Sequence, residues 1–289
     1  MKIRIVHRTL FEYEGPVVNS FNESRLRPST DPMQQCLEYR MLTEPGAVLR
    51  SYHDLFGNQV EFFEINHSHA RMSVETHCVV ETLLSNPFDF SQIVSFEDLQ
   101  SAINRETLHD YLIESPYIPL TPELWRCAMD LHQPQTDVWK SVLNINEHLH
   151  RNLIYHPGST TVQTSATEAL AQKSGVCQDF AHIMIGILRS LKIPARYVSG
   201  YIYESDAMLE AVDREKQTAS HAWCEVYLPG VGWRGVDPTN NLVVNDHYVK
   251  LAVGRDYADA TPLKGTYRGP KTRSMQVSVK VQRMEALVG

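Results

Sequence analysis

The chain has 289 residues, of which 43% are hydrophobic and 21% charged, and its formal net charge at pH 7 is −7. This composition is typical of a globular protein of ordinary solubility, and the length favours two domains. The acidic balance excludes the basic surface that binding to nucleic acid or to an anionic membrane requires. No apolar stretch reaches the roughly 18 residues of a membrane span. We therefore expect no nucleic-acid partner and no membrane association, while the sequence leaves the oligomeric state open.

The cysteine and histidine content indicates reduced thiols and no metal. Five cysteines are an odd number without close pairing, and the first residues lack the apolar core of a signal peptide, so we expect a cytoplasmic protein. No CxxC pair is present, which argues against a zinc–thiolate site. His67 and His69 have near ligand spacing, but their surroundings predict a solvated turn. Since no nucleotide-binding glycine loop is present either, we expect no cofactor.

The first part of the chain predicts a β domain. Apolar and polar residues alternate at 2–8, 36–42, 60–65 and 71–81, as in half-buried strands. Short strands at this spacing predict an antiparallel, sandwich-like domain over residues 1–85. This region contains no catalytic constellation, so we expect it to act as a scaffold or to gate substrate.

Residues 86–160 predict a helical segment that packs on the rest of the core. Thr121 is a helix N-cap, and an apolar stripe predicts a further helix over about 136–153. Ser165 and Glu168 have the spacing of a capping box, which predicts a short helix leading into the next segment.

A cysteine at the start of an apolar run is the first candidate for chemistry. Cys177 follows Gly175, and the run behind it ends before Pro194, which predicts a sharp turn and then a buried helix with Cys177 in its first turn. Unpaired backbone N–H groups and the helix dipole favour the thiolate at that position. Cysteine is also a common small core residue, so this segment alone leaves both interpretations open.

Two later segments provide partners for a nucleophilic thiol. Residues 220–228 alternate as a strand, 229–232 have turn chemistry, and 233–240 predict the returning strand. His221 begins the first strand and Asp237 ends the second, so the hairpin brings both to the same end. A histidine that takes the thiol proton, oriented by a carboxylate, is what cysteine-based acyl transfer requires.

These three segments resemble the core motifs of the transglutaminase-like superfamily, whose members have a papain-like Cys, His and Asp in that chain order. The motifs are Gly175-Val176-Cys177-Gln178-Asp179, Ser220-His221-Ala222-Trp223 and Gly235-Val236-Asp237-Pro238-Thr239. Residues 254–262 are similar to the bacterial branch that carries an extra N-terminal β domain. The resemblance implies an α+β fold in which a papain-like transglutaminase core, with its nucleophile helix on an antiparallel sheet, occupies residues 161–289.

The resemblance also implies roles for individual residues. Cys177 is the expected nucleophile, His221 its base and Asp237 the orienting acid. An aromatic donor upstream of the cysteine helps to hold the oxyanion in this superfamily, which makes Tyr155 a candidate; a packed tyrosine at a helix end is the alternative. The backbone N–H of Gln178 is a second oxyanion candidate. We expect hydrolysis of a peptide or protein amide through a thioester, with glutamine transamidation and a catalytically idle binding module as alternatives.

Two further features flank these motifs. Residues 204–219 are polar and irregular, which predicts a loop that rims the site just before His221. His182 lies five residues after Cys177 and so does not share the face of the thiol. We expect it to make a structural hydrogen bond.

Overall fold

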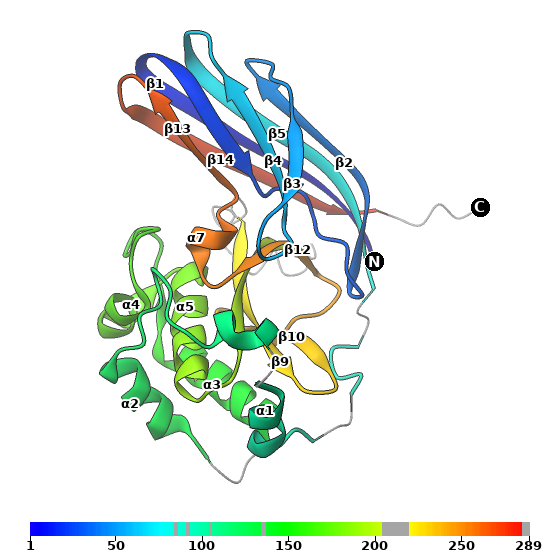
Figure 1. The fold of residues 1–289 in the computed structure, drawn as a ribbon, viewed down its shortest axis with the longest axis vertical. Coiled ribbons are helices and arrows are strands. Elements are labelled where there is room, and N and C mark those ends of the chain that lie inside the picture. The colour runs from blue at the N-terminus through cyan, green and yellow to red at the C-terminus, as the bar shows by residue number, and fades with distance from the viewer. Residues whose placement is uncertain (84–85, 91–92, 104–105, 134–136, 204–219, 285–289) are drawn as a thin grey trace, which may run out of the picture.

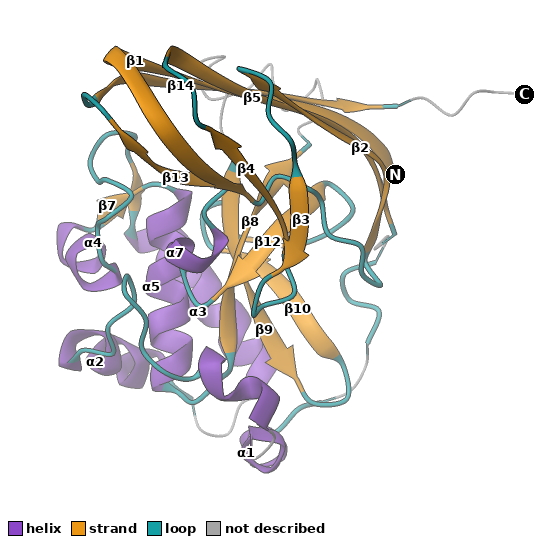
Figure 2. Cartoon of the chain, turned by 45° about the horizontal axis from the view of Figure 1, so that its top comes forward, coloured by secondary structure: helices purple, strands orange, loops and turns teal. Residues whose placement is uncertain are grey.

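Two antiparallel β-sheets organise the fold, one in the upper and one in the lower half of the molecule in Figure 1. The computed structural model describes residues 1–83, 86–90, 93–103, 106–133, 137–203 and 220–284. Helices lie together beside the lower sheet (Figure 2), so the predicted α+β class is confirmed. The loop predicted at 204–219 lies outside the described residues.

The upper sheet is built around one long strand. Its strands are β1 (Lys2–Ser24), β2 (Gln34–Glu44), β3 (Arg50–His53), β4 (Gln59–Ile65), β5 (His69–Thr82), β13 (Leu263–Arg268) and β14 (Thr272–Arg283). The first half of β1 pairs with β5 and β14, and its second half pairs with β4 and β13. The register with β5 shifts between Glu12 and Val17, and irregularities of this kind bend a strand. The strands predicted in the first 85 residues are confirmed.

The C-terminal strands belong to this upper sheet, which differs from the predicted division of the chain. The sequence placed all of 161–289 with the nucleophile helix, but residues 263–283 return to pair with β1. On β14, Val279 and Val281 pack against the same core as Ile3 and Ile5. Alternation identifies a strand without identifying its partner, which is why the sequence did not indicate this pairing.

The lower sheet has five strands in the order β11-β10-β9-β8-β12. Their bounds are β8 (Ala195–Ile202), β9 (His221–Leu228), β10 (Gly232–Asp237), β11 (Leu242–Val243) and β12 (Tyr248–Gly254). The predicted hairpin is formed by β9 and β10. Gly230 and Gly232 in its turn have φ values of 77° and 88°, a region in which glycine avoids the strain of other residues.

The helices cover one side of the lower sheet (Figure 2). They are α1 (Phe96–Ile103), the 3₁₀ helix η1 (Glu106–Tyr111), α2 (Pro122–Leu131), α3 (Val138–Asn152), α4 (Ala166–Gln172), α5 (Cys177–Ser190) and α7 (Tyr257–Ala260). Thr121 caps α2, and Ser165 with Glu168 forms the predicted capping box on α4. No helix in the described part of the chain is long and apolar enough to cross a membrane.

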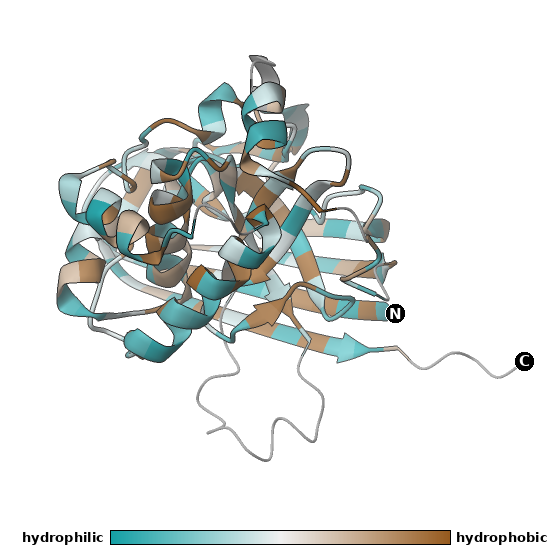
Figure 3. Cartoon of the chain, turned by 90° about the horizontal axis from the view of Figure 1, so that it is seen from below, coloured by the Kyte–Doolittle hydropathy of each residue, from teal (hydrophilic) through white to brown (hydrophobic). Residues whose placement is uncertain are grey.

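Two large apolar cores and a smaller cluster around Trp223 and Tyr248 stabilise this arrangement. One lies between the helices and the lower sheet and surrounds α5, most of which is buried. The other packs against the upper sheet and includes Tyr201, Val249 and Leu251 from β8 and β12 of the lower sheet. The long strands alternate between apolar and polar residues, as Figure 3 shows by colour. Because the second core draws on both sheets, the two halves are packed as one structure.

Candidate active site

Cys177 is the first residue of α5, as the sequence predicted. The entry to the helix is fixed by a short parallel pair, β6 (Ile154–Tyr155) beside β7 (Ser174–Gly175). A Cβ atom at Gly175 would lie 2.6 Å from Cβ and Oδ2 of Asp179. The glycine is therefore required for the close approach of Asp179.

Asp179 caps the helix that carries the thiol. The N-cap residue Val176 has no side-chain oxygen, and its N–H donates to Asp179 Oδ2 at 2.7 Å. The hydroxyl of Thr160 donates to the same oxygen at 2.6 Å. The Asp179 carboxyl thus joins the first turn of α5 to the loop that follows Tyr155. Burial raises its pKa, although these hydrogen bonds act in the opposite direction.

The hairpin brings His221 and Asp237 together. His221 is the first residue of β9 and Asp237 the last of β10, and His221 Nε2 lies 2.8 Å from Asp237 Oδ2. This leaves Nδ1 as the ring nitrogen available to the side chain of Cys177. Cys177 is half-buried and interacts with the His221 ring. The structure therefore places all three residues of the expected set at one site.

Five donors hold the Asp237 carboxylate. Its Oδ1 accepts hydrogen bonds from the backbone N–H groups of Thr239 (2.9 Å) and Asn240 (3.2 Å). Its Oδ2 accepts from the side chains of His221, Asn240 and Tyr248, each at 2.8 Å. Burial raises the pKa of Asp237, but the charge of His221 and these donors outweigh it and lower the pKa overall. The carboxylate is therefore ionised and fixed in orientation.

The electrostatics of the site favour a charged imidazole. Burial lowers the pKa of His221, but the charge and hydrogen bond of Asp237, together with the side chain of Cys177, raise it to about 10. An imidazolium beside a thiol stabilises the thiolate, because the two opposite charges attract each other at short distance. The arrangement therefore places an imidazole with a raised pKa beside the Cys177 side chain.

The two oxyanion candidates offer the site different groups, a phenol and a backbone N–H. Tyr155 pairs with Gly175 across β6 and β7, and burial with the charges of Cys177 and Asp179 raises its pKa to about 12. Its phenol is thus a protonated donor near the thiol, 41% exposed as a residue. The side chain of Gln178 points elsewhere, because its Nε2 donates to the carbonyl of Val162 at 3.0 Å. What Gln178 offers the site is its backbone N–H in the first turn of α5.

Tyr248 was not predicted from the sequence as a site residue. Its hydroxyl reaches Asp237, and its ring packs edge-on against Trp223, which in turn stacks on His221 with ring centres 6.1 Å apart. Trp223 lies within a motif, whereas no local pattern distinguishes Tyr248 from the other tyrosines. Only the fold places it here.

Two further histidines that the sequence singled out, His182 and His69, make local hydrogen bonds. His182 is fully buried, and its Nε2 accepts the backbone N–H of Tyr257 at 3.2 Å, which confirms the predicted structural hydrogen bond. His69 Nδ1 lies 2.9 Å from the carbonyl oxygen of His67. Among the described residues, no three His, Cys, Asp or Glu side chains form a group that fits a metal ion.

Comparison with known proteins agrees with this arrangement. Residues 126–238 match the transglutaminase-like superfamily, and residues 3–81 match the bacterial transglutaminase-like N-terminal region. An uncharacterised protein of Mycobacterium leprae is 35% identical over 287 residues, which is 98% of this chain and 99% of that protein. The chain belongs to the transglutaminase-like superfamily. The superfamily resemblance of the three motifs is thereby confirmed, and the core match contains Cys177, His221 and Asp237.

The fold of this transglutaminase-like protein also occurs in solved structures. A protein of Cytophaga hutchinsonii, described only provisionally as a cysteine protease, has a TM-score of 0.77 at 24% identity, over 99% of this chain and 92% of that one. A protein-glutamine gamma-glutamyltransferase of Pseudomonas aeruginosa is 39% identical over 69 residues, which is 23% of this chain and 10% of that protein.

Proposed function

We propose that this transglutaminase-like protein uses Cys177 for acyl transfer and hydrolyses an amide bond in a peptide or protein. The observation that carries the proposal is the position of His221. Its Nε2 is held by the ionised Asp237, and its ring interacts with Cys177. A fixed tautomer and a raised pKa suit an imidazole that must first hold, and then return, the thiol proton.

The proposed reaction has two steps. The Cys177 thiolate attacks the amide carbonyl, while first-turn N–H groups of α5 and the phenol of Tyr155 stabilise the oxyanion. His221 donates its proton to the leaving amine as the C–N bond breaks, which leaves a thioester on Cys177. His221 then removes a proton from water, which attacks the thioester and releases a carboxylic acid and the thiol.

Hydrolysis is our first choice because the side of the site that carries Tyr155 is exposed to water. Tyr155 is 41% exposed, and the preceding residue Ile154 is 68% exposed. Val162, whose carbonyl accepts a hydrogen bond from Gln178 Nε2, is 53% exposed. Transamidation requires an amine to reach the thioester before water does. It is the second candidate, favoured by the stretch shared with the Pseudomonas gamma-glutamyltransferase.

Mass spectrometry of a mixed peptide library with a labelled primary amine tests the proposal. We expect cleaved peptides with the wild type and none with a folded Cys177→Ala protein. Cys127→Ala is the matched control, since this half-buried thiol lies on α2, and it should retain turnover. Label at glutamine would instead establish transamidation. Turnover by the folded Cys177→Ala variant would refute the nucleophile, and an untouched library with slow Cys177 alkylation would indicate a binding module.

A further inference from the structure

The outer strand of the lower sheet is covered by two carboxamide side chains. β12 is an edge strand, so one row of its backbone groups has no strand partner. At Lys250, the N–H donates to Gln34 Oε1 and the carbonyl accepts from Gln34 Nε2, both at 2.8 Å. At Val253, the N–H donates to Asn58 Oδ1 and the carbonyl accepts from Asn58 Nδ2, both at 2.7 Å.

Both carboxamides come from the N-terminal domain. Gln34 is the first residue of β2, and Asn58 directly precedes β4. They are 3% and 6% exposed, so solvent does not compete for these bonds. A carboxamide presents a donor and an acceptor as a backbone peptide does, and each of these two side chains therefore replaces a neighbouring strand at one residue of β12.

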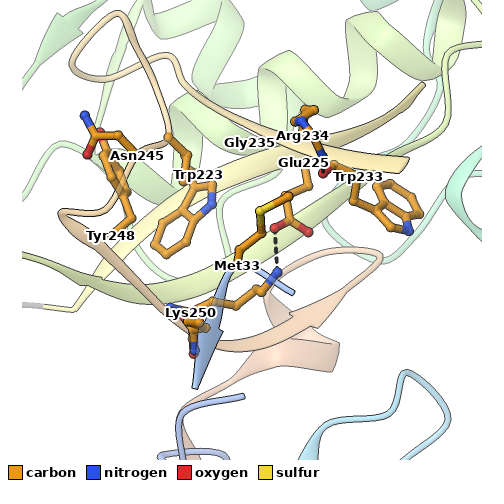
Figure 4. Close-up of a pocket in the computed structure, with 11 residues that line it drawn as sticks. Met33, Trp223, Glu225, Trp233, Arg234, Gly235, Asn245, Tyr248 and Lys250 are labelled. Carbon is orange, nitrogen blue, oxygen red and sulfur yellow. Dashed lines mark hydrogen bonds and ion pairs between the residues drawn. The ribbon is translucent and has the colours of Figure 1, made fainter. Parts of the chain in front are cut away.

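An ion-pair chain extends the same contact toward β9. Lys250 Nζ lies 2.8 Å from Asp31 of the N-terminal domain and 2.7 Å from Glu225, as the dashed line in Figure 4 shows for Glu225. Glu225 also pairs with Arg196 and lies on β9, four residues after His221. Charges this buried require close partners, so the strand that carries His221 is tied to the N-terminal domain.

The covered strand leads directly to the site. β12 begins at Tyr248, whose hydroxyl donates to Asp237 Oδ2 and which is 4% exposed. Tyr248 precedes Lys250 by two residues and therefore lies on the same strand face. In Figure 4, Tyr248 and Lys250 line the same hollow as Trp223.

We propose that the N-terminal domain positions the catalytic set through β12. Gln34 and Asn58 act as positioning residues that hold Tyr248 against Asp237 and so fix the orientation of His221. The inference rests on the proposed function of Cys177, His221 and Asp237, and it gives the N-terminal domain a role in the reactivity of the thiol as well as in stability.

A double-mutant cycle tests this coupling. The variants are Gln34→Ala, Asn58→Ala, Tyr248→Phe and the two doubles with Tyr248→Phe, each assayed where circular dichroism shows it folded. The readout is the rate of Cys177 alkylation by iodoacetamide as a function of pH. Each single variant should lower the rate near neutral pH on the order of fivefold. In the Tyr248→Phe background, Gln34→Ala or Asn58→Ala should lower it further by less than about twofold. Gln34→Met, which keeps the side-chain volume, replaces the alanine variant if that fails to fold.

Matched controls remove carboxamides that touch neither β12 nor the site. Gln35→Ala and Asn66→Ala alter exposed side chains of the same domain and should leave the alkylation profile unchanged. Effects of Gln34→Ala and Tyr248→Phe on the rate that multiply fully would overturn the inference. So would Gln34→Ala and Asn58→Ala proteins that lose stability but keep the wild-type alkylation profile.

A second readout separates this inference from the proposed function. The Nε2–H proton of His221 reports its bond to Asp237 by NMR without any chemistry. If wild-type Cys177 is alkylated no faster than Cys127, the proposed function fails. The Nε2–H signal still tests whether the N-terminal domain fixes the orientation of His221. An unshifted Nε2–H signal in Gln34→Ala and Asn58→Ala, together with a shifted one in Tyr248→Phe, would refute the inference.

Discussion

Replacement of Asp237 by asparagine exchanges one carboxylate oxygen for an NH₂ group in a site that contains only donors. Oδ1 receives two backbone N–H groups, from Thr239 and Asn240, and Oδ2 receives three side-chain donors, including His221 and Tyr248. Whichever way the amide is turned, its nitrogen faces at least two donors. Asp237 is 0% exposed, so water cannot replace the lost acceptor.

The size of the effect follows from this geometry. A buried donor left unpaired costs about 1–3 kcal/mol, so two of them predict a loss of about 2–6 kcal/mol in the free energy of unfolding. His221 also loses the charge that raises its pKa from 6.5 to about 10. A histidine whose pKa is raised in the folded protein stabilises the fold at pH values below its ordinary pKa. This contribution disappears as the pH rises through the pKa of the folded protein. The difference in the free energy of unfolding between wild type and Asp237→Asn should therefore be largest near pH 6.5 and decrease toward pH 10.

Urea denaturation of both proteins across this pH range measures the difference in the free energy of unfolding. The rate of Cys177 alkylation reports how readily the thiolate forms. Near neutral pH the variant should be alkylated at least about tenfold more slowly, since one pKa unit corresponds to a factor of ten. Asp130→Asn, an exposed carboxylate on α2, is the matched control and should change neither quantity. A stability loss below about 1 kcal/mol would contradict the hydrogen-bond argument. A difference in the free energy of unfolding that does not decrease as the pH rises would contradict the charge argument.

Two further substitutions test packing and a buried charge. Gly200→Ala would place a Cβ 2.2 Å from the carbonyl oxygen of Val249, so the midpoint of urea denaturation should fall by the equivalent of about 1–3 kcal/mol or more. Gly46→Ala, with nothing within 4 Å, should leave it unchanged, and equal midpoints for the two variants would contradict this packing. Burial raises the pKa of Glu61 from 4.5 to about 7, so wild-type stability should fall as pH rises across that window, by about 3 kcal/mol at most. Glu61→Gln keeps an acceptor for the Tyr39 hydroxyl and should abolish this slope in thermal melts, whereas parallel slopes would show that Glu61 is not its source.

The sequence by itself determined the features whose causes lie within a few residues. The capping box of Ser165 and Glu168 depends on adjacent groups, and so does the glycine turn that aligns His221 with Asp237. Their spacing is visible in the printed chain, and so is Cys177 at the start of an apolar helix. These signals nominated three residues for the site, and the resemblance of their motifs to the transglutaminase-like superfamily implied the fold class.

Tertiary structure decided what depends on contacts between distant segments. Gln34 meets Lys250 across 216 positions, and Tyr248 reaches Asp237 from a strand whose place is set by the N-terminal domain. The last strands likewise have the alternation of any half-buried strand, yet they pair with β1 at the opposite end of the chain. A carboxamide, a tyrosine or an alternating strand looks the same in sequence wherever it is used. Its partner is chosen only when the whole chain packs, because burial and hydrogen-bond satisfaction are properties of the assembled fold.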